Sequence, residues 1–305
     1  MARAASRADT SLDSSGILWL EHINMEVGDR EQALAFYCGF LGFMEDPSPS
    51  FHVNLGSQQL HLGVAAAPHR ITGSVGLTVP SLDALRARQP AAAATLKGSR
   101  FRVEDHGDAL TATCPWGNTY HCFALPPPPS DPAAASLPTM VRKHLGVDDS
   151  LAVRGKPGIR FVELRARLGS AEAIGAFYAD VFGCPVHHAT VEGFETVTIG
   201  AGPGVHLLFC CDGAMCEADE QRMSGVHFCV YIERFKQAYD KLLARRLIWT
   251  NPRFAHLDTC DTWEEARDGR QFRFKDLVDP ASGVKLLELE HETRSVRHFQ
   301  FYKDV

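Results

Sequence analysis

The fold is decided by the stretch Leu20-Glu-His22-Ile-Asn-Met-Glu-Val-Gly-Asp29-Arg-Glu-Gln-Ala-Leu-Ala-Phe-Tyr37-Cys-Gly-Phe-Leu-Gly-Phe43. It has the pattern of a strand, a tight turn and a helix. Successive side chains of a strand point to opposite faces, so His22, Asn24 and Glu26 share one face and apolar residues occupy the other. Asp29, with Gln32 three residues later, is an N-cap signature for the helix. The pattern predicts a helix on the apolar face and a polar face that is open to a site.

The stretch is repeated 141 residues later in the chain. Ala35-Phe36-Tyr37 recurs as Ala176-Phe177-Tyr178, and Leu41-Gly42-Phe43 recurs as Phe182-Gly183-Cys184. A proline-rich segment between the two copies has the composition of a linker rather than of a core element. We therefore expect two related halves, with the ranges 1–16 (tail), 17–125 (N-terminal domain), 126–156 (linker), 157–292 (C-terminal domain) and 293–305 (C-terminal extension).

Each half divides again into two units of similar order, in which one strand is followed by a helix and then by more strands. The strands are expected at 18–27, 51–55, 58–64, 74–79, 100–105, 109–114, 118–124, 159–167, 194–199, 204–210, 225–232, 271–278 and 284–290. The helices are expected at 30–41, 81–88, 170–182 and 234–245. Strands predominate and each unit has one helix, which predicts an α+β fold of four βαβββ modules.

This module order, together with the His22 strand and the Asp279-Pro280-Ala-Ser-Gly283 turn before the last strand, resembles the vicinal oxygen chelate superfamily. That superfamily includes glyoxalase I, fosfomycin-resistance and bleomycin-resistance proteins, and extradiol dioxygenases. The resemblance covers nearly the whole chain and implies two tandem glyoxalase-like domains with cup-shaped mixed sheets. It also implies that the two modules of each half form one cup, whose first and last strands supply the ligands of a divalent metal.

In the N-terminal half, the resemblance assigns the ligand positions to His22, His61, Ser74 and His121. His121 ends Cys114-Pro-Trp-Gly-Asn-Thr-Tyr-His121, where the family has Asp-Pro-x-Gly-x-x-x-Glu. Three imidazoles with an open fourth position suit zinc, iron or manganese and not calcium. The absence of both family carboxylates is a departure from a glyoxalase-type mechanism.

In the C-terminal half, the resemblance assigns His227 together with Glu163 or His206, with Leu208 as the alternative to His206. Either Glu288 or Glu290 on the last strand completes the set. Such a mixed nitrogen and oxygen site suits Fe(II) or Mn(II). Glu163 is also consistent with a strand face of ion pairs, because Arg165 and Arg167 lie on the same face.

Glu288 and Glu290 are also the candidate catalytic residues, since a carboxylate beside the metal that is not a ligand can transfer protons. Arg273 and Lys275 alternate with phenylalanines on a half-buried strand and are the candidates for binding an anionic substrate. The charged segment 258–270 is expected to be a solvated loop, or a lid over the cup.

Composition excludes several classes of function. The net charge of −6 gives no basic field for nucleic acid or an anionic membrane. No apolar run approaches the length of a membrane helix, and the first sixteen residues lack the apolar core of a secretory signal. The nine cysteines lack zinc-finger spacing and indicate reduced residues of a cytoplasmic protein.

The leading hypothesis is a metal-dependent enzyme, a dioxygenase, isomerase or lyase, that chelates neighbouring oxygens of a small organic substrate through Fe(II), Mn(II) or Zn(II). The alternative is a metal-free cup of the bleomycin-resistance type that sequesters a small molecule. A structural or interaction role is the third hypothesis. The protein is expected to be a monomer or a homodimer.

Overall fold

The computed structural model of the chain describes residues 16–125 and 157–301, apart from 192 and 203. The predicted linker lies outside the described residues, as do residues 1–15 of the predicted tail and residues 302–305 of the predicted extension. None of the helices in the described ranges combines the length and the apolar character that a membrane span needs. All nine cysteines lie in the described ranges and are free thiols.

The N-terminal half follows the predicted order closely. Its elements are β1 (Ile17–Val27), α2 (Arg30–Leu34), the π-helical η1 (Ala35–Phe40), β2 (Met44–Glu45), β3 (His52–Leu55), β4 (Gln58–Val64), β5 (Ser74–Val79), α3 (Leu82–Thr95), β6 (Arg102–Asp105), β7 (Ala109–Thr113) and β8 (Thr119–Ala124). Asp29 caps α2, since its Oδ1 accepts from the Gln32 amide at 2.8 Å. Helix α3 continues through Pro90, seven residues beyond its predicted end.

The C-terminal half repeats this order with two additional short helices and with one strand fewer in its last module. Its elements are β9 (Gly158–Ala166), α5 (Ala171–Phe182), β10 (Val186–Val191), β11 (Phe194–Gly200), β12 (His206–Cys211), α6 (Glu217–Met223), β13 (His227–Ile232), α7 (Phe235–Ala244), α8 (Trp263–Gly269), β14 (Gln271–Val278) and β15 (Lys285–Ser295). Strand β15 runs to Ser295, five residues beyond its predicted end at Glu290. The segment expected to begin a C-terminal extension is therefore partly a strand.

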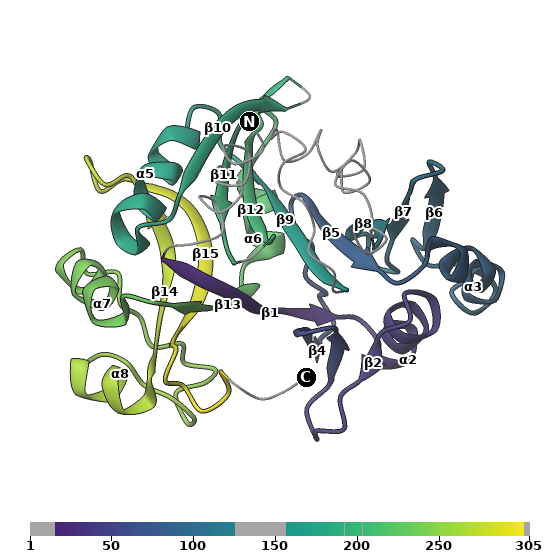
Figure 1. Ribbon diagram of the computed structural model, residues 1–305, viewed down its shortest axis with the longest axis horizontal. Coiled ribbons are helices and arrows are strands. Elements are labelled where there is room, and N and C mark those ends of the chain that lie inside the picture. Colours follow the sequence, from purple (N-terminus) through teal and green to yellow (C-terminus); the bar gives the residue numbers. More distant parts are fainter. Residues whose placement is uncertain (1–15, 126–156, 192, 203, 302–305) are drawn as a thin grey trace, which may run out of the picture.

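The strands form two mixed sheets, and each sheet takes strands from both halves of the chain (Figure 1). Sheet I has the order β14-β15-β13-β1-β4-β3-β2 and combines the first and fourth modules. Sheet II has the order β10-β11-β12-β9-β5-β8-β7-β6 and combines the second and third modules. The junctions are antiparallel pairs, β1 with β13 and β5 with β9. The expected pairing of the two modules within each half does not occur, because each module joins a module of the other half edge to edge.

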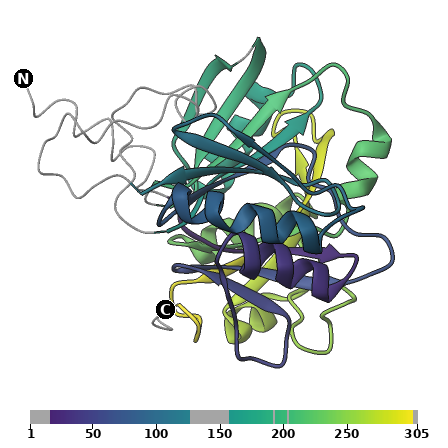
Figure 2. The same cartoon turned by 90° about the vertical axis from the view of Figure 1, so that its right-hand side faces the viewer.

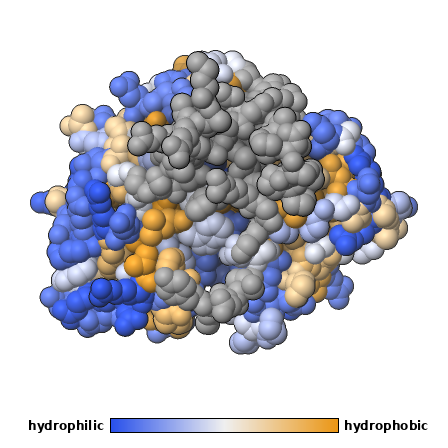
Figure 3. Space-filling view, viewed as in Figure 1, coloured by the Kyte–Doolittle hydropathy of each residue, from blue (hydrophilic) through white to orange (hydrophobic). Residues whose placement is uncertain are grey.

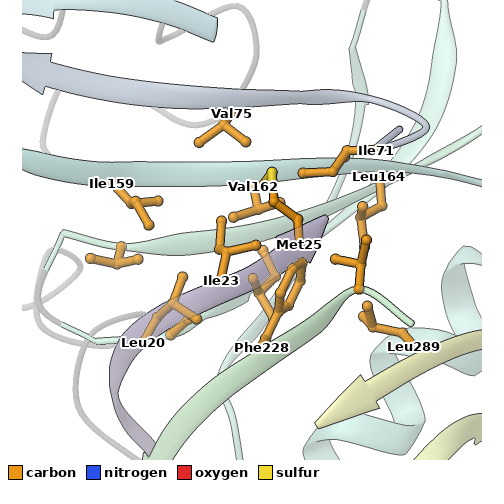
Figure 4. Close-up of a cluster of buried hydrophobic side chains, with 14 of the residues drawn as sticks. Leu20, Ile23, Met25, Ile71, Val75, Ile159, Val162, Leu164, Phe228 and Leu289 are labelled. Carbon is orange, nitrogen blue, oxygen red and sulfur yellow. The ribbon is translucent and has the colours of Figure 1, made fainter. Parts of the chain in front are cut away.

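The apolar faces of the two sheets pack against each other and form the main core. Figure 4 shows Ile23 and Met25 of β1 and Phe228 of β13 pointing toward Val75 of β5 and Val162 of β9, and all five residues are buried. Helices α2 and α3 lie one above the other at one side of this core (Figure 2). The apolar side of β1 is buried as its alternation predicted. It faces sheet II in addition to the expected helix, from which the Tyr37 hydroxyl reaches Met25 Sδ at 3.9 Å. The opposite face of each sheet remains available for polar side chains.

The surface shows small apolar areas among hydrophilic side chains on the face drawn in Figure 3. The exposed large apolar residues are spread along the chain: Met44, Val64, Leu168, Leu243, Leu257, Val284 and Phe299. Single exposed apolar residues are ordinary on a globular protein. The polar faces of the sheets are therefore the better candidates for a functional site.

Candidate metal centre

The polar face of sheet I gathers ionisable residues from five strands. Strand register places Asn24 beside His227 and beside His61, and His227 beside Glu290. His22 lies beside Cys229 of β13, which in turn lies beside Glu292 of β15, and Arg273 of β14 is on the far side of Glu292. Residues that pair across neighbouring strands share a face and are in contact. The first and last modules therefore assemble one polar cluster that neither half could form alone.

Glu21 holds the His22 ring in one orientation, and a β-bulge in β1 brings Glu21 to the polar face. The register of β1 against β13 shifts between Leu20 and His22, and Glu21 accepts from His22 Nδ1 at 2.8 Å. Burial raises the pKa of Glu21, but the hydrogen bond and charge of His22 and the charge of Arg294 lower it to about 2. An imidazole whose Nδ1 proton is held by a carboxylate presents its other nitrogen as a lone pair. His22 Nε2 is buried and has no hydrogen-bond partner among the described residues.

Two further potential metal-ligand atoms lie near His22 Nε2. His22 Nε2 lies 3.9 Å from Glu292 Oε2, and His227 Nε2 lies 3.5 Å from the same oxygen. All three residues are buried, and the three atoms lie within 4.8 Å of one another. Burial lowers the pKa of His227, so its neutral form, the form that binds metals, is favoured. Two imidazoles and one carboxylate are the donor set of many non-haem Fe(II) sites.

Arg273 is the cation that already occupies this cluster. Its Nη2 donates to Glu292 Oε2 at 2.6 Å and its Nη1 to Glu290 Oε1 at 2.9 Å, and its Nε lies 3.3 Å from Asp258 Oδ1. Arg294 also pairs with Glu292, at 2.5 Å. Burial raises the pKa of Glu292, but Arg294 and Arg273 outweigh it and hold the pKa well below its usual range. The predicted role of Arg273 in binding an anionic substrate does not fit this geometry, because its guanidinium is engaged by three carboxylates.

A cavity of about 230 Å³ adjoins the cluster, lined by Glu290, Glu288 and Lys275 among others. Both oxygens of Glu290 accept from Asn251 Nδ2, at 3.0 and 2.9 Å. Glu288 lies nearer the surface and accepts from Ser224 and Lys285. Although burial raises the pKa of Glu288, these hydrogen bonds lower it, which makes this carboxylate a weak base. Lys275 lies 5.2 Å from the centre of the Trp249 ring and, in the described part of the chain, has no ion pair.

The segment between α7 and α8 covers the cluster. Phe254 stacks over the Arg273 guanidinium at 4.8 Å and meets the edge of the His227 ring at 5.6 Å. Arg253 donates to Glu26 Oε1 at 2.8 Å and so ties this segment to the end of β1. The predicted lid at 258–270 is partly helical, because it contains α8. Arg253 and Phe254, which cover the cluster, come before this segment in the chain.

His61, predicted as a ligand, stacks on the His22 ring and is not in the group formed by His22, His227 and Glu292. The two ring centres are 3.6 Å apart, and His52 stacks on the other side of His61 at the same distance. His61 Nε2 pairs with Gln59 Oε1 at 3.0 Å. Burial, with the neighbouring His22 and His52, lowers the pKa of His61 well below its usual value. The column of neutral rings fixes the plane of His22.

The remaining predicted ligands are in sheet II, so the expected sets His22–His61–His121 and Glu163–His227 are both divided between sheets. His121 pairs with Thr111 Oγ1 at 3.1 Å. Glu163 accepts from Ser74 at 3.2 Å and pairs with Arg165 at 3.1 Å, and the residue beside it on β12 is Leu208. Ser74, His206 and its alternative Leu208 are therefore all in sheet II.

Sequence reasoning missed Glu292 and Glu21. Glu292 continues the alternation of Glu288 and Glu290, so a longer strand would have revealed it. Glu21 joins the polar face only because of the bulge beside it, and no feature of the sequence marks that bulge. Asn251, Asp258 and Arg294 were likewise not foreseen, since their contacts depend on the tertiary fold.

Neither a protein-family model nor a curated protein sequence matches this chain. Solved structures do match its fold over nearly its whole length. Two variants of glyoxalase I from Zea mays align with TM-scores of 0.53 and 0.54 at 15% and 13% identity, covering 96% and 93% of this chain and 97% and 96% of theirs. A candidate dioxygenase from Bacillus subtilis aligns with a TM-score of 0.50 at 14% identity, covering 92% of this chain and 86% of its own. The chain has the vicinal oxygen chelate fold, as the sequence resemblance predicted.

Proposed function

We propose that this protein is a divalent-metal-dependent enzyme acting on a small oxygenated organic molecule at the polar face of sheet I. The observation that carries the proposal is the convergence of His22 Nε2, His227 Nε2 and Glu292 Oε2 within 4.8 Å beside a cavity. The similarity in fold to glyoxalase I and to a candidate dioxygenase supports the same class of chemistry. The reaction would be an oxygenation, an isomerisation or an elimination.

The residues present fit such an ion. His22 has a buried, unpartnered nitrogen whose tautomer is set by Glu21, which is the arrangement found behind metal-binding histidines. The cluster of Glu21, Asp258, Glu290, Glu292 and the two arginines carries two more negative than positive charges, so a divalent cation would neutralise it. Two imidazoles and a carboxylate suit Fe(II), Mn(II) or Zn(II). When bound, such an ion supplies Lewis-acid polarisation of two neighbouring substrate oxygens.

The chain's own residues would bind the substrate and move its protons. Glu290 is the proposed proton-transfer base, because its Oε1 lies 4.0 Å from His227 Nδ1 and the residue also lines the cavity. Lys275 is the proposed contact for an anionic group of the substrate, since its ammonium group lines the same cavity. Phe254 and Asn251 exclude water from above. Glu288 would remain a rim residue, held by Lys285.

Elemental analysis of the purified chain after reconstitution with Fe(II), Mn(II) or Zn(II) tests the proposal. We expect one ion per chain, lost in His227→Ala and in His22→Ala. His121→Ala is the matched control, because this histidine is in sheet II and should leave the metal content unchanged. Retention of the ion in both sheet I variants, or the absence of any ion from the native chain, would refute the assignment.

The second candidate function is a metal-free binding protein. The Arg273 guanidinium is 2.6 Å from the oxygen that faces both histidines, so a cation is already provided by the chain itself. In that case the native chain would take up no ion, and ligands would bind in the cavity with unchanged affinity in the presence of a chelator. Thermal shift measurements with and without chelator distinguish the two functions.

A further inference from the structure

A second cavity, of about 140 Å³, lies where strands β5 and β8 of sheet II begin, and three separate segments meet there. The segment from Arg70 to Gly73 leads into β5, the turn around Gly117 precedes β8, and Arg222 belongs to α6. Apart from Ile71, its side-chain lining is polar. The cavity shares no lining residue with the cavity of sheet I.

Arginines converge on this second cavity without enough carboxylates to balance them. A Cβ placed on Gly117 would lie 3.2 Å from Arg100 Nη1 and 3.5 Å from Arg70 Nε, so two guanidinium groups flank the same point. Arg222 lines the cavity as well. Within the described ranges neither Arg70 nor Arg100 forms an ion pair, although like charges at short range repel each other.

Asp219 is the single carboxylate in the lining, and it is already engaged. It accepts from Arg222 Nη1 at 2.9 Å and from the amide and thiol of Cys216 at 3.3 and 3.1 Å. These hydrogen bonds, the Cys216 thiol first, lower the pKa of Asp219. The lining holds two arginines, Arg70 and Arg222, and one aspartate. With Arg100, which lies beside Gly117, two positive charges remain in and around a small polar space.

Gly117 keeps that space open. Its φ of +101° lies in a region that residues with a side chain rarely adopt, and a Cβ at this position would stand between the two guanidinium groups. Thr119, half-buried, adds a hydroxyl to the lining. A volume of about 140 Å³ is room for a tetrahedral oxyanion.

We propose that this cavity binds the phosphoryl group of a small phosphorylated molecule. A phosphate monoester carries a charge of about −1.5 to −2 at neutral pH, which matches the two uncompensated positive charges. Guanidinium groups present paired donors in the geometry that phosphate oxygens accept. The assignment is independent of the metal proposed for sheet I.

The test is a calorimetric titration of the full chain with inorganic phosphate. The ionic strength is kept constant, because salt screens surface charges. We expect saturable binding that weakens about tenfold or more in Arg70→Gln and in Arg100→Gln, since each loses charge-assisted hydrogen bonds. Arg70→Lys, which keeps the charge but not the paired donors, should lie between them and the native chain. Arg102→Gln on β6 is the matched control, because Arg102 already faces Glu104, and it should bind as the native chain does.

Unaltered melting temperatures of the four variants would show that they are folded, since the three altered side chains are all exposed. Equal phosphate affinity in the native chain and Arg70→Gln, or no saturable binding at all, would overturn the proposal. Binding of malonate as tight as that of phosphate would overturn the phosphoryl assignment. Metal content should be the same in all variants, so this test and that of the sheet I centre succeed or fail separately.

Discussion

Arg273→Met should lower the free energy of unfolding by about 3–5 kcal/mol at neutral pH, the usual cost of removing one partner from a buried ion pair. Arg273 has 4% of its side chain exposed and contacts Glu290 and Glu292, each also 4% exposed. Methionine retains the aliphatic volume, so the measured loss reports the charge. Asp258, with 25% of its side chain exposed, can recover water and should contribute little to the loss.

The size of this loss should depend on pH with a defined sign. Arg273 helps to hold the pKa of Glu292 well below its usual range, so the pKa rises when the guanidinium is removed. The folded variant then takes up a proton on mild acidification, and its deficit relative to the native chain shrinks. Added Mn(II) should also recover part of the stability by binding the folded state.

Urea unfolding of both chains at neutral and mildly acidic pH measures these differences. Arg267→Met is the matched control, because Arg267 pairs with Asp268 on the surface, and it should change stability by less than about 0.5 kcal/mol. A loss below about 1 kcal/mol in Arg273→Met would mean that the carboxylates do not depend on this guanidinium, and the description of the cluster would be wrong.

Three further predictions concern the surroundings of the cluster. Burial lowers the pKa of His291 to about 4 from 6.5, so the native chain should lose up to about 3 kcal/mol of stability as pH falls from 6.5 through 4. Urea unfolding across this range should show a smaller loss in His291→Gln. Equal losses in the two chains would contradict this role of His291. Arg253→Ala breaks a partly exposed ion pair with Glu26, so it should cost less than about 1 kcal/mol yet speed hydrogen exchange at 249–257, and unchanged exchange would mean that the pair does not hold the segment. Glu21→Gln removes the carboxylate behind His22 and should weaken metal binding about 10–100-fold in a competition titration, whereas native affinity would exclude this role.

Much of the fold was predictable because it depends on local pattern. Alternation in β1 assigned His22 to the polar face and Ile23 to the core, and the repeat at 141 residues revealed the module order. The pairing between modules was not predictable in this way. The first strand of each module can pair with the first strand of a module from the same half or from the other half, and the local pattern does not distinguish the two. His22, His61, His227 and Glu290 were therefore identified individually and assigned to two separate sites.

The pairing of the modules decides which of the predicted ligand positions lie in the same sheet. If modules paired within each half, the serine at position 74 and the leucine at 208 would impair one cup each. Because the second and third modules pair with each other, Ser74 and Leu208 both belong to sheet II. Sheet I then keeps His22, His227 and Glu292 together, contributed by the two ends of the repeat. The proposed metal centre therefore draws on the outer pair of modules, and the cavity proposed for a phosphoryl group lies where strands of the inner pair begin.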